Sequence, residues 1–295
     1  MTRPPGVEAD YPLSRLTSVG VGGPARWFAQ PSRVEELAEV LAWAAGEGLA
    51  VASVGLGSNM LAADAGFDGL VVRLAGELAA VTRDGSRVRC GGGASLAVVV
   101  RRSREWGLAG IEFGCAIPGT VGGAVRMNAG AYGSDMSAVL AEARVVSASG
   151  DRTADPAGLG LRYRHSDLVD GEVVAEAVLE LAPSEPDDVA ATIRDLQRRR
   201  REAQPSKVRT FGSVWKNPDP ERTAGRLLDE CGLRGHRVGG ARISPVHANF
   251  IENMGDATAA DVIALMAEAR RRARERYGVT LEHEVRMLGD VRLPD

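Results

Sequence analysis

Residues 110–133, GIEFGCAIPGTVGGAVRMNAGAYG, combine closely spaced glycines with interspersed aliphatic residues. Glycine lacks a Cβ, so its backbone can turn through positive φ and lie directly against a ligand. Successive N–H groups in such turns form concave sites for anions such as a pyrophosphate. A flexible linker would carry Ser, Lys and Glu in place of these Ile, Val and Met residues. The stretch therefore indicates a phosphate-binding turn inside a packed domain.

The composition bounds the class of protein. The chain has 295 residues, 44% of them hydrophobic and 25% charged, as in a globular protein of about two domains. Its 36 Lys and Arg against 39 Asp and Glu give a net charge of −3, so no global field favours nucleic acid. No apolar signal segment opens the sequence, and no stretch approaches the roughly 18 apolar residues of a membrane span. We therefore expect a cytoplasmic protein with no membrane contact.

Cysteine and histidine patterns argue against a disulfide framework or a metal site. Cys90, Cys115 and Cys231 are far apart and form no C-x-x-C pair, and the histidines show no metal-ligand spacing. Cys115 lies inside the glycine-rich stretch and could act as a nucleophile. We favour a small buried apolar residue instead, because no histidine lies nearby in sequence.

Hydrophobic periodicity predicts both helices and strands. The helix at 32–46 should begin with Ser32 as its N-cap and Glu35 completing a capping box, and the helix at 258–277 should be capped by Thr258 and end at Gly278. The other helices are expected at 96–106, 187–202 and 224–231, and the strands at 51–54, 69–74, 87–90, 142–149 and 173–181.

A second glycine-rich turn, GLGSN at 55–59, follows the buried strand at 51–54. The carboxyl end of a strand is a common place for a phosphate. Taken alone, the pattern fits an ordinary βα turn equally well.

The chain changes character at 204–220, QPSKVRTFGSVWKNPDP, which is rich in turn residues. We interpret this segment as a domain boundary and a functional loop, followed by a smaller α+β unit. A last strand is expected at 279–288, where apolar and polar residues alternate. This alternation places Glu282 and Glu284 on one face, which is either solvated or the wall of a site.

Five motifs occur in order: GSN at 57–59, IPGTVGGAVRMNAGAYG at 117–133, YRHS at 163–166, GSVWKNP at 212–218 and LEHEVRMLG at 281–289. Over nearly its full length the chain resembles the UDP-N-acetylenolpyruvoylglucosamine reductases, flavoenzymes of peptidoglycan synthesis. The compact spacing between Arg164 and Ser213 is similar to the shorter, second type of this family, which lacks an extra tyrosine-bearing loop.

The resemblance implies an α+β protein with an FAD-binding fold of the vanillyl-alcohol-oxidase/PCMH kind. We expect FAD-binding subdomains at 1–57 and 58–204 and a substrate domain at 205–295, whose last residues can return to the first subdomain. FAD would be held non-covalently and reduced by NADPH. Hydride would then pass from the flavin to the enolpyruvyl methylene carbon of the UDP-sugar, giving UDP-N-acetylmuramate. We expect a monomer.

Two residues match the family's catalytic positions, and a third is expected to assist them. Hydride arrival leaves negative charge on the neighbouring carbon and its carboxylate, which needs a cation and hydrogen-bond donors. Arg164 of YRHS matches the active-site arginine, which can hold a carboxylate by a two-pronged contact. Ser213 of GSVWKNP matches the proton donor to that carbon. Glu284 is the expected assisting acid, with Glu282 as the less favoured alternative.

Binding residues follow from the same motifs. Lys216 and Asn217 are expected to hold the substrate's carboxylate or diphosphate, and Tyr163 to contact substrate or flavin. Tyr132 offers a further side-chain bond to the flavin. The residues expected at the FAD are Gly55, Gly57, Ser58, Asn59, Ile117, Pro118, Gly119, Thr120, Gly122, Gly123 and Asn128.

Three positions depart from the family pattern. Ala116 stands where glycine is usual before IPG, which bears on the flavin path there. Trp215 and Leu161 each replace a phenylalanine and are conservative packing changes. None of the proposed catalytic positions is lost.

Two other functions fit the same glycine-rich turns. An oxidase of the same flavin fold would often tether its flavin to His or Cys, and no histidine lies in the glycine-rich stretches. A nucleotide-binding regulator would bind UDP-sugar and FAD without consuming NADPH.

Overall fold

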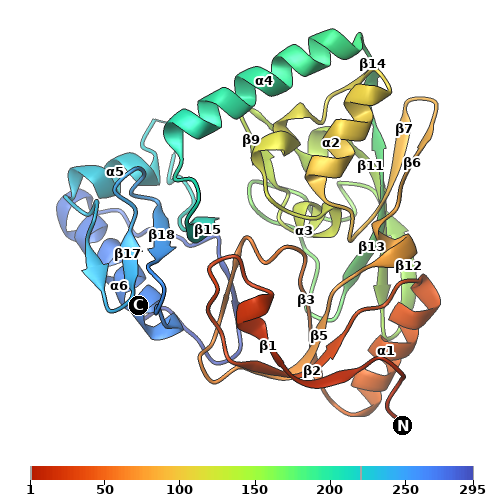
Figure 1. Ribbon diagram of the computed structural model, residues 1–295, viewed down its shortest axis with the longest axis horizontal. Helices are drawn as coiled ribbons and strands as arrows, with labels where there is room; N and C mark the ends of the chain where they lie inside the picture. Colours follow the sequence, from red (N-terminus) through yellow and green to blue (C-terminus); the bar gives the residue numbers. More distant parts are fainter. Residues whose placement is uncertain (1, 220, 295) are drawn as a thin grey trace. The chain divides into compact units, whose positions relative to one another are not determined.

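The computed structural model describes residues 2–219 and 221–294 (Figure 1). Its contacts define two compact units, each made of segments that are separate in sequence. Unit 1 comprises Met1–Ala9, Trp27–Leu56 and Gly69–Arg200, and unit 2 comprises Asp10–Arg26, Gly57–Asp68 and Arg201–Asp295. The division into three consecutive segments stays a prediction.

Unit 1 contains a five-stranded antiparallel sheet with the order β12-β11-β13-β7-β6. Helix α3 packs against β13 and β7, and α1 packs against β11 and β3. The strands of this sheet are β6 (Val81–Asp84), β7 (Arg87–Gly91), β11 (Leu140–Ser147), β12 (Gly150–Ala154) and β13 (Val173–Glu180). The helices are α1 (Val34–Gly46), α2 (Leu96–Glu105), α3 (Val121–Arg126) and α4 (Pro186–Ala203), the last of which continues past the end of unit 1 at Arg200.

Three smaller strand groups complete this part of the fold. The sheet β1-β2-β5-β3 has parallel pairing between β3 and β5, with Val51 opposite Leu70. The chain passes between the units inside β1, β2 and β5. The bounds are β1 (Glu8–Pro12), β2 (Pro24–Ala29), β3 (Ala50–Ser53), β5 (Phe67–Val72), and the two-stranded pairs β8 (Leu108–Ala109) with β14 (Ala182–Pro183) and β9 (Gly130–Ala131) with β10 (Ser134–Asp135).

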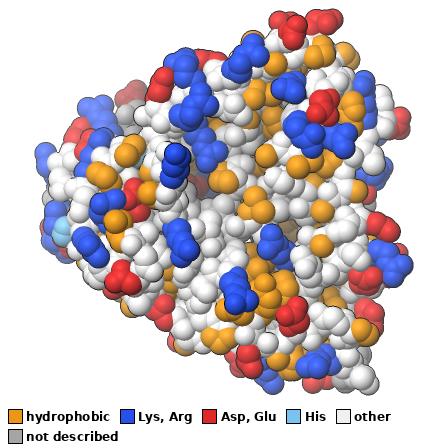
Figure 2. Space-filling view, in the orientation of Figure 1, with side chains coloured by type: hydrophobic (Ala, Val, Ile, Leu, Met, Phe, Trp, Pro, Cys, Tyr) orange, Lys and Arg blue, Asp and Glu red, His pale blue; other side chains and the backbone are white. Residues whose placement is uncertain are grey.

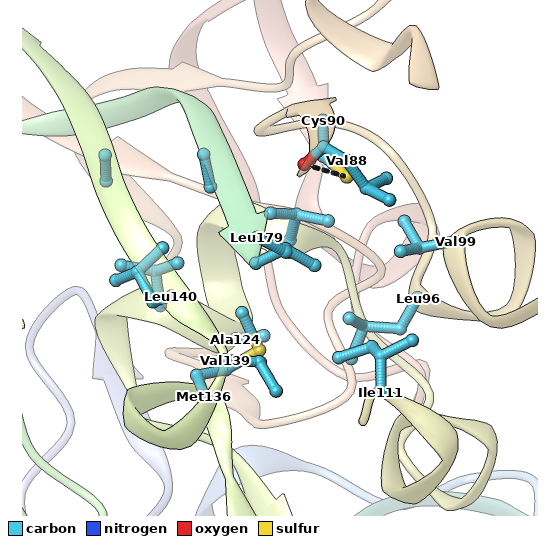
Figure 3. Close-up of a cluster of buried hydrophobic side chains, with 14 of the residues drawn as sticks. Val88, Cys90, Leu96, Val99, Ile111, Ala124, Met136, Val139, Leu140 and Leu179 are labelled. Atoms are coloured by element: carbon cyan, nitrogen blue, oxygen red, sulfur yellow. Dashed lines mark hydrogen bonds between the residues drawn. The ribbon is translucent and has the colours of Figure 1, made fainter. Parts of the chain in front are cut away.

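The core of unit 1 is filled by aliphatic side chains from α2, α3 and the large sheet. Figure 3 shows Leu96 and Val99 of α2 near Leu179 of β13 and Ala124 of α3. Burial raises the pKa of the Cys90 thiol to about 12, and its Sγ donates to the Val88 carbonyl at 3.8 Å. Cys90 therefore serves as a core residue.

Helix α1 confirms the predicted helix but corrects its start. It begins at Val34 with Arg33 as the N-cap, and Arg33 makes no side-chain capping bond. The predicted capping box of Ser32 and Glu35 is wrong: the Ser32 N–H and hydroxyl both donate to Glu36, each at 2.8 Å. Because the helix starts later than expected, Ser32 lies one residue before the N-cap, and the carboxylate that reaches back to it is one residue farther along.

Unit 2 contains the antiparallel sheet β15-β18-β17-β16 and the parallel pair β19-β4. The buried core lies between the sheet and α6, which packs on β16 and β17. Thr258 and Asp261 form a capping box at the start of α6, and Gly278 ends the helix with φ 68°. The predicted cap at Thr258 and the predicted end at Gly278 are therefore confirmed. The elements are β4 (Met60–Ala62), β15 (Arg209–Ser213), β16 (Arg237–Val238), β17 (Ala241–Ile243), β18 (Phe250–Asn253), β19 (Arg286–Leu288), α5 (Ala224–Glu230) and α6 (Ala259–Tyr277).

The last strand is shorter than the predicted 279–288. Only Arg286–Leu288 forms a strand, β19, and it pairs with β4. The preceding residues lie beside 214–216 and make one isolated bridge, between Trp215 and His283. Because β15 ends at Ser213, the segment 214–216 that pairs with residues 282–284 is not part of a regular strand.

Basic and acidic side chains are both spread over the face that Figure 2 shows. In the described part of the chain, no helix has the length and apolarity to cross a membrane. The described residues also hold no group of three or more His, Cys, Asp or Glu placed to bind a metal.

Candidate active site

The glycine-rich stretch is a fixed part of unit 1. Thr120 is the N-cap of α3, and its side chain accepts from the Gly123 N–H at 3.4 Å. The Gly122 N–H donates to the Gly92 carbonyl at 2.8 Å. A Cβ at Gly122 would lie 3.0 Å from that carbonyl oxygen and 3.1 Å from that of Val174, so the close approach favours glycine.

The two glycine-rich turns meet within unit 1. Gly55 follows β3 and lies against Thr120, where a Cβ would overlap the threonine hydroxyl. In residues 2–219 and 221–294, the N–H groups of Gly55, Leu56, Gly119 and Thr120 donate to no protein acceptor. Unused backbone donors on two adjoining turns are what a diphosphate requires. The residues present therefore fit the diphosphate of FAD.

The GLGSN turn continues into unit 2, where main-chain contacts hold it. Gly57 has φ 63°, and a Cβ there would overlap the carbonyl of Leu16. The Gly57 carbonyl accepts from the Ser18 N–H at 3.0 Å and from the Ser18 hydroxyl at 3.1 Å. The Ser18 hydroxyl also lies 2.7 Å from the Thr210 carbonyl of β15. Ser18 thus joins the turn to the strand that carries Ser213.

Arg164 occupies the tip of a two-residue turn in unit 1. Arg162 and His165 exchange backbone hydrogen bonds of 3.2 and 3.0 Å, and Arg164 between them has φ 53°. Its Nη2 donates to the Gly130 carbonyl at 2.7 Å, and its guanidinium lies 5.0 Å from the centre of the Tyr163 ring. Tyr163 is 52% exposed. The turn presents both side chains predicted for substrate contact.

The side chain of Asn128 supports that turn by hydrogen bonds. Its side chain is buried, accepts from the Ser137 N–H at 2.9 Å, and donates to Asp135 and to the Arg162 carbonyl, each at 3.2 Å. The sequence predicted a bond from Asn128 to the flavin. In the structure its amide is committed to neighbours within unit 1, so a flavin bond stays a prediction that would compete with these contacts.

Ser213 ends β15 in unit 2, next to a bulge. The pairing of β15 with β18 shifts register between Thr210 and Ser213, and Gly212 there has φ 82°. A bulge re-aims the side chains that follow it and is common beside active sites. Asn249 then holds the next turn, because its side chain accepts from the Trp215 N–H and donates to the Trp215 carbonyl, both at 2.9 Å.

Glu284 lies beside the Ser213 segment, whereas Glu282 forms an ion pair. The Glu284 N–H donates to the carbonyl of Val214 at 2.9 Å, and its own carbonyl accepts from Asn59 Nδ2 at 2.8 Å. Glu282 is exposed, and its carboxylate lies 3.1 Å from Lys216 Nζ. Glu284 is half-buried, and its backbone pairs with the residue that follows Ser213.

The remaining predicted residues have local partners. Asn217 Oδ1 accepts from the Ala224 N–H at 3.1 Å, at the start of α5. Cys115 Sγ lies 3.9 Å from the Ile193 carbonyl of α4, and burial raises the pKa of this thiol, which favours the apolar interpretation over a nucleophile. Tyr132 is 44% exposed, and partial burial raises its pKa.

Sequence reasoning missed Ser18 and Asn249. Ser18 lies in LTSVGVGGPA at 16–25, where the spacing of the glycines is the recognisable pattern. A single serine hydroxyl in such a segment gives no signal of its own. Asn249 lies in HANFIEN at 247–253, between apolar residues. The only signal for it in the sequence is an asparagine between the apolar residues Ala248 and Phe250, because an amide buried there needs partners.

Comparisons with known proteins agree with this arrangement. Residues 25–154 match the model of an FAD binding domain, and residues 204–288 match the UDP-N-acetylenolpyruvoylglucosamine reductase C-terminal domain. A UDP-N-acetylenolpyruvoylglucosamine reductase 2 of Symbiobacterium thermophilum is 45% identical over 291 residues, 97% of this chain and 94% of that protein. A reductase of the same name from Sphingopyxis alaskensis is 43% identical over 280 residues, 94% of this chain and 93% of that protein.

A solved structure extends the comparison to the fold. The UDP-N-acetylenolpyruvylglucosamine reductase of Thermus caldophilus superposes with a TM-score of 0.82 at 36% identity, over 96% of this chain and 98% of that one. Together with the match at residues 25–154, this confirms the predicted α+β architecture with an FAD-binding domain.

Proposed function

Because this chain belongs to the UDP-N-acetylenolpyruvoylglucosamine reductase family and is an FAD-dependent oxidoreductase, we propose that it reduces the enolpyruvyl ether of UDP-N-acetylglucosamine with NADPH, giving UDP-N-acetylmuramate for peptidoglycan synthesis. The observation that carries the proposal is the hydrogen bond of 2.9 Å from the Glu284 N–H to the carbonyl of Val214. This bond brings the proposed acid next to the proposed proton donor, Ser213, although the two are far apart in sequence.

Backbone groups hold the cofactor in this proposal. The N–H groups around Gly55 and Thr120 would bind the FAD diphosphate, and residues 117–123 would contact the ribityl chain. When bound, FAD would supply the redox chemistry, taking a hydride from NADPH and providing one for the methylene carbon of the substrate. The contact between Gly55 and the Thr120 hydroxyl supports this assignment, because any larger residue at Gly55 would fill the space between the two turns.

Ser213 supplies the proton. The incoming hydride leaves a pair of electrons on the carbon next to the methylene group, delocalised into the carboxylate. The Ser213 hydroxyl gives its proton to that carbon, and the Glu284 carboxylic acid protonates the serine oxygen in turn. The bulge at Gly212 supports this role because it sets the direction of the Ser213 side chain.

Arg164 stabilises the charge on the substrate. Its guanidinium binds the carboxylate on which negative charge develops. The bond to the Gly130 carbonyl and the contact with the Tyr163 ring support this role, because they restrict the orientation of the guanidinium. Lys216, Asn217 and Tyr163 bind other parts of the substrate. Lys216 must exchange its ion pair with Glu282 to do so.

The Ser213→Ala variant tests the mechanism in two half-reactions, followed by stopped-flow absorbance of the flavin. Reduction by NADPH should keep its rate. Reoxidation by the enolpyruvyl substrate should slow by roughly two to four powers of ten, the usual worth of a positioned proton donor. Equal slowing of both half-reactions would mean that Ser213 has another role.

Two outcomes would favour the other functions. An oxidase with tethered flavin would retain its yellow colour after denaturation and filtration, whereas free FAD would pass the filter. A regulator would bind FAD and UDP-sugar without consuming NADPH. Size-exclusion chromatography with light scattering tests the accompanying expectation of a monomer, and fractionation of cells tests the expected cytoplasmic location.

A further inference from the structure

Asn59 links two segments that the proposed function uses. Its side-chain Nδ2 donates to the carbonyl of Glu284 at 2.8 Å, and its own carbonyl accepts from the Arg286 N–H at 3.0 Å. Only the NH2 group of an asparagine side chain can donate to a carbonyl, so the bond fixes the orientation of this amide.

The hydrogen bond from Asn59 to Glu284 takes the place of a backbone hydrogen bond between β4 and β19. The parallel pair β4-β19 begins with Met60 opposite Arg286. Among the described residues, no strand continues this pairing before Arg286, because residue 59 belongs to a turn. The Asn59 amide takes the place of a backbone N–H and extends the pairing back to Glu284.

Glu284 is thereby held from two directions. Its N–H donates to the Val214 carbonyl, next to Ser213, and its carbonyl accepts from Asn59. With both peptide groups fixed, the direction of the Glu284 Cα–Cβ bond is fixed as well. The turn that carries Asn59 is itself held at Gly57 by Ser18 and Leu16.

We infer that Asn59 is a positioning residue, whose side chain orients Glu284 for proton transfer rather than binding the flavin; this rests on the proposed function of Ser213 and Glu284. The inference differs from the expectation drawn from the sequence, which placed Asn59 among the FAD contacts. It assigns the last residue of the GSN motif to the second half-reaction.

The test uses the full chain with FAD and the variant Asn59→Asp, which keeps the shape and removes the donor. We expect the FAD dissociation constant, followed by flavin fluorescence, and the rate of reduction by NADPH to stay within about twofold of the parent protein. Reoxidation by saturating substrate should slow about tenfold or more, since one orienting hydrogen bond is lost. The dissociation constant of the substrate should not change.

A matched control separates positioning from general loosening of unit 2. Asn253 also donates through Nδ2 to a backbone carbonyl, that of Val19, at 2.8 Å. Asn253→Asp should lower thermal stability and leave both half-reactions unchanged. If Asn59→Asp is unstable, Asn59→Ala provides the same comparison without an added charge.

A double-mutant cycle identifies the partner. In a Glu284→Gln background, Asn59→Asp should cause no further slowing of reoxidation, because its effect passes through Glu284. Additive effects would overturn the inference, as would weakened FAD binding with normal reoxidation at saturating FAD. A parent protein whose flavin is not reduced by NADPH or not reoxidised by substrate would instead contradict the proposed function.

Discussion

The turn that carries Arg164 and the strand end that carries Ser213 are held in place by different means. Two backbone hydrogen bonds close the first, and side chains attach it to the rest of unit 1: Asn128 donates to the Arg162 carbonyl, and the Ser166 hydroxyl donates to the Arg126 carbonyl at 2.6 Å. Main-chain pairing with β18 and a glycine bulge hold the second. Loss of the Asn128 side chain should therefore disturb the Arg164 turn, whereas the position of Ser213 should depend chiefly on backbone geometry.

The largest effect should come from backbone geometry beside the Ser213 segment. Gly57 and Gly48 have nearly equal φ values of 63° and 65°, but a Cβ at Gly57 would overlap the Leu16 carbonyl and one at Gly48 would meet nothing within 4 Å. Gly48→Ala should cost about 1–2 kcal/mol of unfolding free energy from left-handed strain alone. Gly57→Ala should cost more than about 4 kcal/mol, because main chain must also move. Urea unfolding measures both, and equal costs would show that the turn is not held by main chain.

Removal of one side chain should disturb the Arg164 turn strongly. Asn128→Ala removes the three hydrogen bonds of a buried side chain, to Asp135, the Arg162 carbonyl and the Ser137 N–H, at a cost of about 1–3 kcal/mol. The Ser137 N–H keeps its bond to Asp135, and the Arg162 carbonyl keeps its bond from the His165 N–H. Reoxidation of the flavin by substrate should slow roughly tenfold to a hundredfold because Arg164 loses its orientation. Ser137→Ala keeps the backbone donor and is the control. Unchanged reoxidation in a folded Asn128→Ala protein would separate this residue from Arg164.

A side-chain change in β15 should be harmless by contrast. The Thr210 hydroxyl is buried and has no hydrogen-bond partner among the described residues. Thr210→Val removes an unsatisfied group and should leave unfolding free energy unchanged or raise it by up to about 1 kcal/mol. Both half-reactions should keep their rates. Slower turnover would mean that this hydroxyl binds a ligand.

The smallest effect is expected at an exposed side-chain anchor. Hydrogen bonds from Ser32 lower the pKa of Glu36 from its ordinary 4.5 to about 2. The carboxylate is favoured in the folded state, so its contribution to stability is present above pH 4.5 and disappears as pH falls through about 2. Glu36→Gln should lower the melting temperature slightly at pH 7, and the difference should vanish near pH 2. Glu35→Gln should change little, and a pH-independent difference for Glu36→Gln would rule out this origin.

The sequence predicted the ends of a helix well where the capping residue and the group that it binds are close in sequence. The capping box of α6 and its terminal glycine depend only on neighbouring residues, so Thr258 and Gly278 could be identified from the sequence. The predicted capping box of α1 was wrong because the sequence offers two neighbouring glutamates, Glu35 and Glu36, as partners for Ser32. The strand at 279–288 was too long because alternation does not reveal which residues have a strand beside them.

Side-chain hydrogen bonds between residues far apart in sequence could not be predicted. The motifs named Arg164, Ser213 and Glu284, but Asn59 and Asn128 stood in glycine-rich turns and therefore suggested ligand contacts. The amide of Asn59 instead binds Glu284, at a separation of 225 residues. Hydrogen bonds of this kind depend on the tertiary fold, and no spacing rule within a motif expresses them.

The pairing of β4 with β19 has a consequence for synthesis of the chain. Met60 leaves the ribosome long before its partner Arg286, so β4 remains an unpaired strand through most of translation. When Arg286 is synthesised, the segment Gly69–Arg200 of unit 1 is already complete, whereas the strand pairing of unit 2 is completed only at that point. A nascent chain that stops short of Arg286 would expose a strand edge to other chains, so aggregation and degradation should depend on whether translation reaches its end.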